Sequence, residues 1–409
     1  MRGRAGHARA GAAYAGFAVF GGFWGTWGAS IPAIRDQAGI TVGELGTALL
    51  FIGAGALPAM LLSGRIVDHW GQRAAAGLLL VLGFIGVLVA STARDLTSLS
   101  AGLAALGAAS GAADVAINTA AGSAQQVSSR NVITRAHAIF SLGVVVASLL
   151  AGALHQLGAP LMAPFILLAG ASAITAVTLA ATAPRRVDLR HDVPRSPGLG
   201  QRRLSPVLAP LLVLGALGAV ALAVENGHQS WSALYLQDAL HAGPAVAAAG
   251  PAVFAAIVAL TRLAASRLSG DHAAAVLLTG SVTAGAGTAL VAAASTVPLG
   301  LLGFGIAAAG TAALFPTILG VLNARVPEHA RGRANSIVTA VAYLGFLAGP
   351  VYMGGWAKRA HLAGAMFALA ALAAALAPLT AIGLRIVAAT WHGMDGDQVP
   401  NPGRQREVP

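Results

Sequence analysis

Two acidic residues, Asp114 and Glu225, stand inside long apolar stretches of the sequence. Asp114 and Asn118 are four positions apart, so in a helix both side chains lie on one face, and His228 and Gln229 share a face with Glu225 in the same way. A carboxyl group removed from water can alternate between its protonated and ionised forms, so these positions could exchange protons. The alternatives are a hydrogen bond that joins helices for Asp114 and a polar cavity wall for Glu225.

A second group of polar and aromatic residues could contact a small molecule near these acids. His228 could join a proton relay or could pack as a hydrogen-bonded core residue. Trp24 and Trp27 could form an aromatic wall for a ring-shaped substrate, or they could pack against lipid or a neighbouring helix. The predicted substrate contacts are Trp24, Trp27, Asn118, Asn226, His228, Gln229 and Trp231.

Several classes of enzyme and energy source are excluded by what the sequence lacks. There is no cysteine and no His-Glu-x-x-His or Gly-x-Ser-x-Gly motif, so we expect no metal, no cofactor and no hydrolytic nucleophile. Lys358 is the one lysine, and its position in a loop rules out a phosphate-binding Walker motif. The two acids lie roughly 13 Å and 24 Å from the cytoplasmic ends of their segments at 1.5 Å per residue, which does not suit an acid–base pair.

The elements that must position these residues are apolar segments of membrane-spanning length. Hydrophobic residues make up 56% of the chain and charged residues only 10%, whereas a soluble domain has about 25% charged residues. Each segment is long enough to cross about 30 Å of hydrocarbon as a helix. The predicted spans are 11–34, 42–63, 74–92, 97–123, 136–157, 160–183, 207–236, 245–265, 273–294, 298–322, 334–357 and 361–389.

The basic residues indicate how these segments are oriented. When the 25 Lys and Arg residues are sorted into alternate loops, 21 fall on one side and 4 on the other. Loop Lys and Arg remain in the cytoplasm during insertion, so both termini are predicted to be cytoplasmic, in the inner membrane of a bacterium. The net charge of +11 is then explained by helix ends facing anionic lipid headgroups, and no nucleic-acid partner is expected.

The segments divide into two halves around a polar connection. Residues 184–206 contain six arginines and four prolines without apolar periodicity, which is typical of a linker. We therefore predict an N-terminal six-helix bundle at 1–183, a cytoplasmic linker at 184–206, a C-terminal bundle at 207–390 and a disordered tail at 391–409.

The segment after the second span, residues 64–73, carries a recognisable pattern. Gly64, Asp68, Gly71 and Arg73 resemble the signature loop of the major facilitator superfamily, although two of its basic positions are replaced. The resemblance implies a gating role, in which an acid near a helix end locks the cytoplasmic side against the neighbouring half.

Further segments resemble one bacterial branch of this superfamily, the permeases similar to the inner membrane protein YbjJ and the rhizopine-cluster protein MosC. The resemblance implies an all-α membrane fold of twelve helices in two pseudo-symmetric bundles, a central cavity lined by the first, fourth, seventh and tenth helices, and alternating access in a monomer. The segments that carry the resemblance are 32–36, 114–118, 137–143, 225 and 231–236.

The chain also departs from its relatives. Ser30, Gln125 and Ser230 stand where the branch pattern has charged residues, which indicates a different or less charged substrate. The fifth-helix motif of the superfamily's drug-proton antiporters is also absent. Its absence disfavours a multidrug antiporter but does not exclude export.

Together these features predict a secondary active transporter for a small polar or amphipathic solute, such as a sugar-like compound or a secondary metabolite. Protons are the expected coupling ion, and both export and uptake are open. The alternative from another class is a membrane sensor or assembly protein that keeps the fold without transporting.

Overall fold

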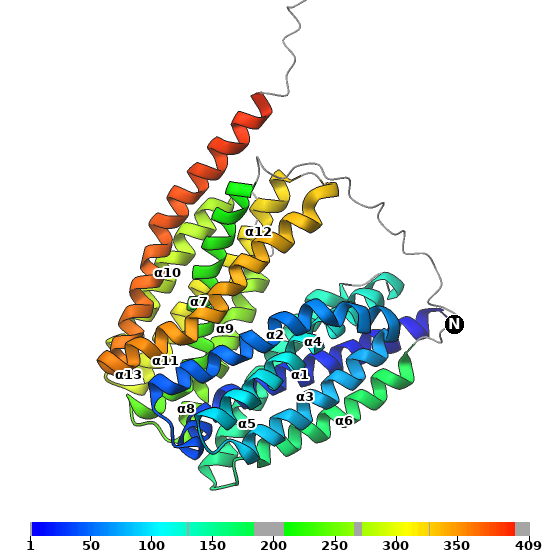
Figure 1. The fold of residues 1–409 in the computed structure, drawn as a ribbon, viewed down its shortest axis with the longest axis vertical. Coiled ribbons are helices and arrows are strands. Elements are labelled where there is room, and N and C mark those ends of the chain that lie inside the picture. The colour runs from blue at the N-terminus through cyan, green and yellow to red at the C-terminus, as the bar shows by residue number, and fades with distance from the viewer. Residues whose placement is uncertain (1, 129–130, 184–207, 266–271, 327, 397–409) are drawn as a thin grey trace, which may run out of the picture.

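The computed structural model describes residues 2–128, 131–183, 208–265, 272–326 and 328–396, and every regular element in this part of the chain is a helix. Figure 1 shows how the helices are arranged. In chain order they are α1 (Arg2–Ala38), α2 (Val42–Trp70), α3 (Gln72–Thr92), α4 (Leu96–Ser128), α5 (Val132–Gln156), α6 (Ala163–Thr182), α7 (Leu208–Asp238), α8 (Pro244–Ala247), α9 (Ala249–Ala265), α10 (Ala273–Ala292), α11 (Val297–Thr311), α12 (Leu314–Arg325) and α13 (Glu328–Gly396).

Among the described residues, ten helical segments are long and apolar enough to cross a membrane. One of them, Ala330–Trp391, has 62 residues, and its helix α13 is broken at Ala360 and His361, where the φ angle of His361 is 58°. Figure 1 shows the two legs of α13 meeting at this break. The all-helical membrane architecture is thus confirmed. The count of twelve, in which α13 crosses twice and α1 crosses once, remains a prediction.

The connection between α1, α2 and α3 follows from local residue chemistry. Thr41 and Glu44 form a capping box at the start of α2, in which each side chain accepts a hydrogen bond from the other residue's backbone N–H. Gly71 ends the helix with a φ angle of 52°, a conformation that glycine adopts without strain. The sequence predicts that the second span ends at residue 63, but α2 continues to Trp70 because the polar residues after Gly64 include no helix breaker before Gly71. The signature segment is therefore mostly helical rather than a loop.

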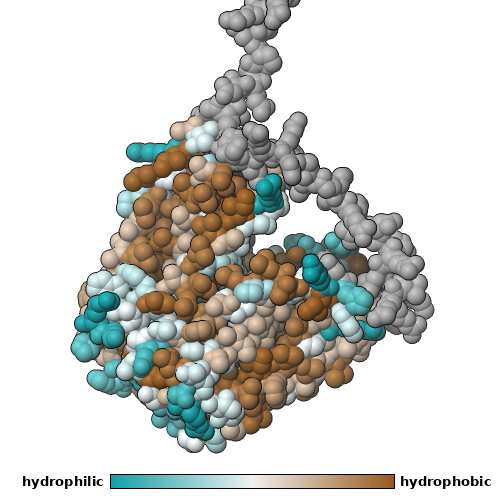
Figure 2. Space-filling model, in the orientation of Figure 1, coloured by the Kyte–Doolittle hydropathy of each residue, from teal (hydrophilic) through white to brown (hydrophobic). Residues whose placement is uncertain are grey.

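The helices form two bundles, α1–α6 and α7–α13, which meet at one end and diverge toward the other (Figure 1). Apolar residues cover the sides of both bundles, whereas hydrophilic residues gather where the bundles meet and at the tips of the diverging arms (Figure 2). Lipid faces the sides of such a protein and water its ends. The domain bounds expected from the sequence stay a prediction, and the predicted linker, 184–206, lies outside the described residues.

Close packing inside the bundles depends on small residues. A Cβ atom on Gly25 of α1 would lie 2.3 Å from the carbonyl oxygen of Val144 on α5, and one on Gly107 of α4 would lie 2.0 Å from that of Ile52 on α2. Any larger side chain at these positions would push the helices apart. In a membrane the hydrophobic effect does not drive helices together, so backbone contact through glycine contributes to their association.

The predicted disordered tail begins too early. The helix α13 continues to Gly396, and Trp391 is only 6% exposed in the apolar core of the C-terminal bundle. The guanidinium carbon of Arg325 lies 5.9 Å from the centre of its ring, a cation–π distance. The tail prediction is therefore wrong for residues 391–396, and residues 397–409 lie outside the described part of the chain.

Candidate functional site

A cavity of about 320 Å³ lies between the two bundles. It is lined by residues of α1, α2, α4 and α5 on one side and of α7, α9, α12 and α13 on the other. Figure 2 shows a hollow between the arms on the side where the bundles diverge. The residues that line the cavity are Phe20, Trp24, Trp27, Gly28, Ile52, Ala56, Met60, Ser110, Gly111, Asp114, Phe140, Ser141, Val144, Leu222, Asn226, Gln229, Ser230, Pro251, Ala255, Val258, Arg262, Phe315, Tyr343 and Phe346.

Asp114 is the acidic residue that lines this cavity. The amide nitrogen of Asn118 donates to its carboxylate at 3.0 Å and to its backbone carbonyl at 2.9 Å. Among the described residues, no Lys, Arg or His forms an ion pair with Asp114. Tyr343, which belongs to the opposite bundle, lines the same cavity. The predicted pairing of Asp114 with Asn118 on one helix face is thus present, although Asn118 itself does not line the cavity.

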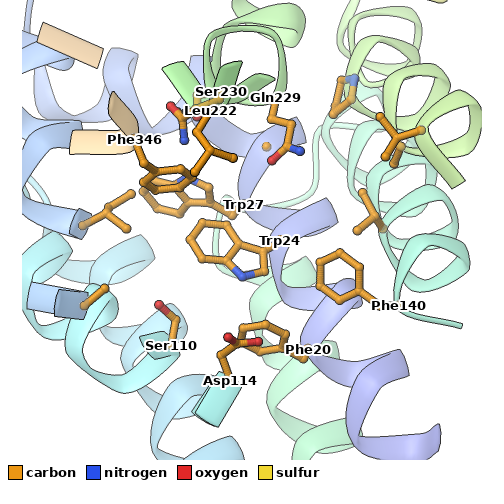
Figure 3. Close-up of a pocket in the computed structure, with 18 of the residues that line it drawn as sticks. Phe20, Trp24, Trp27, Ser110, Asp114, Phe140, Leu222, Gln229, Ser230 and Phe346 are labelled. Atoms are coloured by element: carbon orange, nitrogen blue, oxygen red, sulfur yellow. Dashed lines mark hydrogen bonds between the residues drawn. The ribbon is translucent and has the colours of Figure 1, made fainter. Parts of the chain in front are cut away.

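Aromatic rings form much of the remaining wall. The ring of Phe20 lies 6.5 Å from that of Trp24 and 5.8 Å from that of Phe140, measured between ring centres, and Figure 3 shows Trp24 between Asp114 and Gln229. Trp27 is 3% exposed, and its indole N–H has no hydrogen-bond acceptor among the described residues. Two of the three tryptophans predicted as substrate contacts, Trp24 and Trp27, therefore belong to the cavity wall.

The polar face of α7 divides between the cavity and an ion pair with α9. Asn226 and Gln229, two of the predicted substrate contacts, line the cavity. Glu225 does not line it. Its carboxylate instead accepts hydrogen bonds from the guanidinium of Arg262 at 3.0 Å and from the side chain of Gln229 at 3.2 Å.

Arg262 is a site residue that sequence reasoning missed. The charge pattern groups it with the cytoplasmic loops, but its side chain lines the cavity and also donates to the carbonyl oxygen of Ala312 at 2.9 Å. The signal that could have found it is its position inside the predicted span 245–265, where a charged residue requires a partner. Moving one arginine leaves the charge bias between alternate loops essentially unchanged.

His228 and Trp231 lie outside the cavity lining. His228 is fully buried, and its ring nitrogens are hydrogen-bonded to the carbonyl oxygen of Val224 at 2.7 Å and to the hydroxyl of Thr288 at 3.0 Å. Its ring stacks on Phe254 with ring centres 5.3 Å apart. Trp231 is also fully buried, and its indole N–H has no acceptor among the described residues. The geometry of His228 matches the packing alternative considered for it, and in this conformation neither residue is brought to the cavity.

The predicted gating residues lie at the diverging end of the N-terminal bundle. Gly64 and Asp68 belong to the last turns of α2, Gly71 forms the turn, and Arg73 is exposed at the start of α3. The neighbouring Gln72 donates to the hydroxyl of Thr182 at the end of α6 over 2.8 Å, which ties this turn to its own bundle. The side chain of Asp68 lies outside the described part of the structure.

At the opposite end the two bundles are in close contact. Arg35 of α1 forms an ion pair with Asp238 of α7, and it also pairs with its neighbour Asp36 at 2.5 Å. A Cβ atom on Gly46 of α2 would lie 2.5 Å from the carbonyl oxygen of Pro350 on α13. Contacts of this kind close the cavity at the end where the bundles meet.

A second group of close contacts joins α5 to the segment around α8. A Cβ atom on Gly152 would lie 2.3 Å from that of Ala248, and Ala29, Ala151 and Ala248 form a small buried cluster across the two bundles.

Among the described residues, no group of three or more His, Asp or Glu side chains is arranged to hold a metal ion.

Comparison with known proteins identifies the class to which this fold and cavity belong. The Major Facilitator Superfamily model matches residues 12–274, and the chain therefore belongs to this superfamily. It is accordingly a membrane transporter and not an enzyme. The family membership and fold predicted from the sequence are confirmed.

Individual relatives place the chain more closely within the superfamily. It is 29% identical over 351 residues to an uncharacterized MFS-type transporter of Yersinia pestis, covering 84% of this chain and 87% of that protein. It is 24% identical to the membrane protein MosC of Rhizobium meliloti, covering 84% of this chain and 82% of MosC.

Solved structures agree on the fold. The chain is similar to the crystal structure of the nucleoside transporter NupG, with a TM-score of 0.71, 14% identity, and coverage of 95% of this chain and 99% of that one. The transporter PepTSo gives a TM-score of 0.69 with 14% identity, covering 95% of this chain and 99% of that one.

Proposed function

We propose that this protein is a secondary active transporter that moves a small polar or amphipathic solute across the cytoplasmic membrane by alternating access, driven by protons. The observation that carries the proposal is a cavity between two bundles that is closed at one end and contains Asp114, a carboxylate without an ion-pair partner among the described residues. We propose that it works as a monomer, since the cavity is formed by the two bundles of one chain.

The orientation of the proposed cycle follows from the distribution of basic residues. The 21-to-4 bias toward one set of loops assigns the diverging end, the linker and both termini to the cytoplasm. The cavity then faces inward, and the contacts of Arg35 and Gly46 close its outer end. Outward opening requires these contacts to separate while the arms approach each other at the cytoplasmic end.

Of the two acids predicted to carry protons, Asp114 is the better candidate. Ionised Glu225 is balanced by Arg262 at 3.0 Å, so protonating it would leave an arginine without its partner. Asp114 has no such cation among the described residues, and a carboxylate in a site of low polarity is stabilised by protonation or by a ligand that supplies positive charge. We therefore assign proton exchange to Asp114 and a positioning role to the Glu225–Arg262 pair.

The test uses purified protein in proteoliposomes and the Asp114→Asn variant. This substitution keeps the shape of the side chain and its hydrogen bonds but removes proton exchange. We expect accumulation driven by a pH gradient to vanish, while exchange of substrate across the membrane continues. Asp95→Asn is the matched control, since Asp95 is exposed and caps α4 through the backbone N–H of Ser98 at 2.7 Å, a bond that asparagine can also accept.

Two outcomes would contradict parts of the proposal. Wild-type accumulation in the Asp114→Asn variant would remove Asp114 as the coupling residue. Specific binding without flux in the wild type, across a broad panel of metabolites, would favour the sensor or assembly alternative.

A further inference from the structure

We propose that the cavity selects organic cations, in particular solutes in which a protonated amine is carried by an aromatic or alicyclic body. This inference rests on the proposed transport function and names the substrate class of the same cavity. It is carried by two observations: the charge balance of the lining and its aromatic residues.

The charge balance of the cavity is negative. Asp114 and Arg262 are the charged residues in its lining. The guanidinium of Arg262 is held by the carboxylate of Glu225 and by the carbonyl oxygen of Ala312, so its charge is compensated within the C-terminal bundle. The carboxylate of Asp114 has the neutral amide of Asn118 as its hydrogen-bond donor, and it therefore leaves the described cavity with one uncompensated negative charge.

A single uncompensated charge in a site of low polarity is strongly selective. A solute cation would replace the water lost by Asp114 and would gain a charge-assisted hydrogen bond. A solute anion would meet the same carboxylate without compensation, while its attraction to Arg262 would compete with Glu225 for the guanidinium. The cavity therefore favours positive over negative solutes.

The aromatic residues favour the same class. Only 5% of the chain is aromatic, yet Phe, Tyr and Trp side chains from both bundles line this one cavity. On the side of the N-terminal bundle, the ring of Phe20 contacts those of Trp24 and Phe140. On the side of the C-terminal bundle, Tyr343 and Phe346 pair with ring centres 6.2 Å apart. The faces of such rings attract cations, and they also pack against an apolar ring.

A cavity of about 320 Å³ is at the lower end of the range for small-ligand pockets, which is roughly 300–1,000 Å³, so the solute is small.

Asp114 is proposed to bind both the proton and the organic cation, and this double role constrains the mechanism. One carboxylate cannot hold a proton and an ion-paired amine at the same time, so the two compete and are carried in opposite directions. The other titratable groups of the lining are the guanidinium of Arg262 and the phenol of Tyr343. His137 on α5 does not line the cavity. Proton entry would then drive export of the cation.

The experiment compares three probes of nearly equal shape on the purified full-length protein: 2-phenylethylamine, 2-phenylethanol and 3-phenylpropionate. Binding is measured by isothermal titration calorimetry in detergent. We expect the amine to bind at least about tenfold more tightly than the alcohol, a free-energy difference of about 1.4 kcal/mol, and the carboxylate to bind most weakly. Asp114→Asn should remove the preference for the amine, and Asp95→Asn should keep it.

The proposal is overturned if the carboxylate binds as tightly as the amine, if the preference survives Asp114→Asn, or if the amine does not bind at millimolar concentration.

These binding results are separate from the transport test. A preference for the amine without accumulation in proteoliposomes would refute the proposed transport function and leave the substrate class intact. Gradient-driven accumulation of anionic solutes instead would refute the substrate class and leave transport intact.

Discussion

The ion pair between Arg35 and Asp238 should control how often the closed end of the cavity opens. It joins α1 to α7 and so joins the two bundles, and the side chains are only 14% and 25% exposed. Exposed ion pairs contribute about 0.2–1 kcal/mol and hydrogen bonds to charged groups about 1.5–3 kcal/mol, so a partly buried pair is worth about 1–2 kcal/mol. Removing it with Asp238→Asn should raise the population of the outward-open state roughly 5- to 30-fold.

The natural absence of cysteine makes this measurement direct, because one introduced thiol is the sole label site. Ala29 is 7% exposed in the cluster that joins the bundles at the closed end, so Ala29→Cys should react with a membrane-impermeant maleimide only when this end opens. When Asp238→Asn is added, we expect the labelling rate of Ala29→Cys in intact cells to rise roughly 5- to 30-fold. Arg35→Ala should give a similar rise, with no further increase in the double variant.

Asp36 supplies a matched control. It also pairs with Arg35, at 2.5 Å, but both residues belong to α1, so their pair cannot hold the bundles together. Asp36→Asn should leave the labelling rate near that of the Ala29→Cys parent. Equal rates in Asp238→Asn and the parent, or an equal rise in Asp36→Asn, would refute the idea that this ion pair holds the outer end closed.

Three further predictions address the rest of the cycle. Gly46→Leu should prevent closure of the outer end, because its Cβ would lie 2.5 Å from the carbonyl oxygen of Pro350. Overpacking of about 1–3 kcal/mol should give high maleimide labelling with little transport, and wild-type transport would contradict this. Asp68→Asn should impair transport with normal expression, if the signature segment forms a gate at the cytoplasmic end; unchanged rates would reduce it to an anchor. Topology reporters fused after Arg195 should report cytoplasm and one inserted at Arg94 should report periplasm, and an external signal at Arg195 would overturn the orientation.

The spans could be predicted from the sequence because length and apolar composition are properties of each segment alone. Their ends were less accurate where the deciding interaction is tertiary. Trp391 has the sequence context of a polar tail, yet it is buried in the core of the C-terminal bundle with Arg325 over its ring. Nothing local to residues 391–396 indicates that contact.

The candidate site likewise divides into residues that a single segment reveals and residues whose position depends on tertiary contacts. A carboxylate inside an apolar segment is visible in the sequence, and Asp114 is predicted in this way. Gln229 is predicted because it shares a helix face with Glu225, and Trp24 because it is aromatic. Whether a polar residue faces the cavity or its own bundle depends on the rotation of the helix against its neighbours. His228 and Gln229 are adjacent in sequence, but His228 is enclosed by Phe254 and Thr288 whereas Gln229 lines the cavity. Arg262 lies inside a predicted span, but its partner Glu225 belongs to another helix, so the sequence does not show that the two side chains pair.

The pairing of Arg262 with Glu225 also explains why the two acids have different expected roles, although both lie inside membrane-spanning segments. A charge that is neutralised by a fixed partner in its own bundle is unchanged by movement of the bundles relative to each other. A charge at the wall between bundles, as in Asp114, changes its surroundings each time the cavity opens to the other side. Only the second arrangement couples protonation to conformation, since protonation of Asp114 alters the free energy of the two states by different amounts. Coupling therefore requires that Asp114 keep no permanent cation, and a substitution that supplied one, such as Ser110→Lys in the same cavity wall, should abolish both proton-driven accumulation and binding of organic cations while leaving the fold intact.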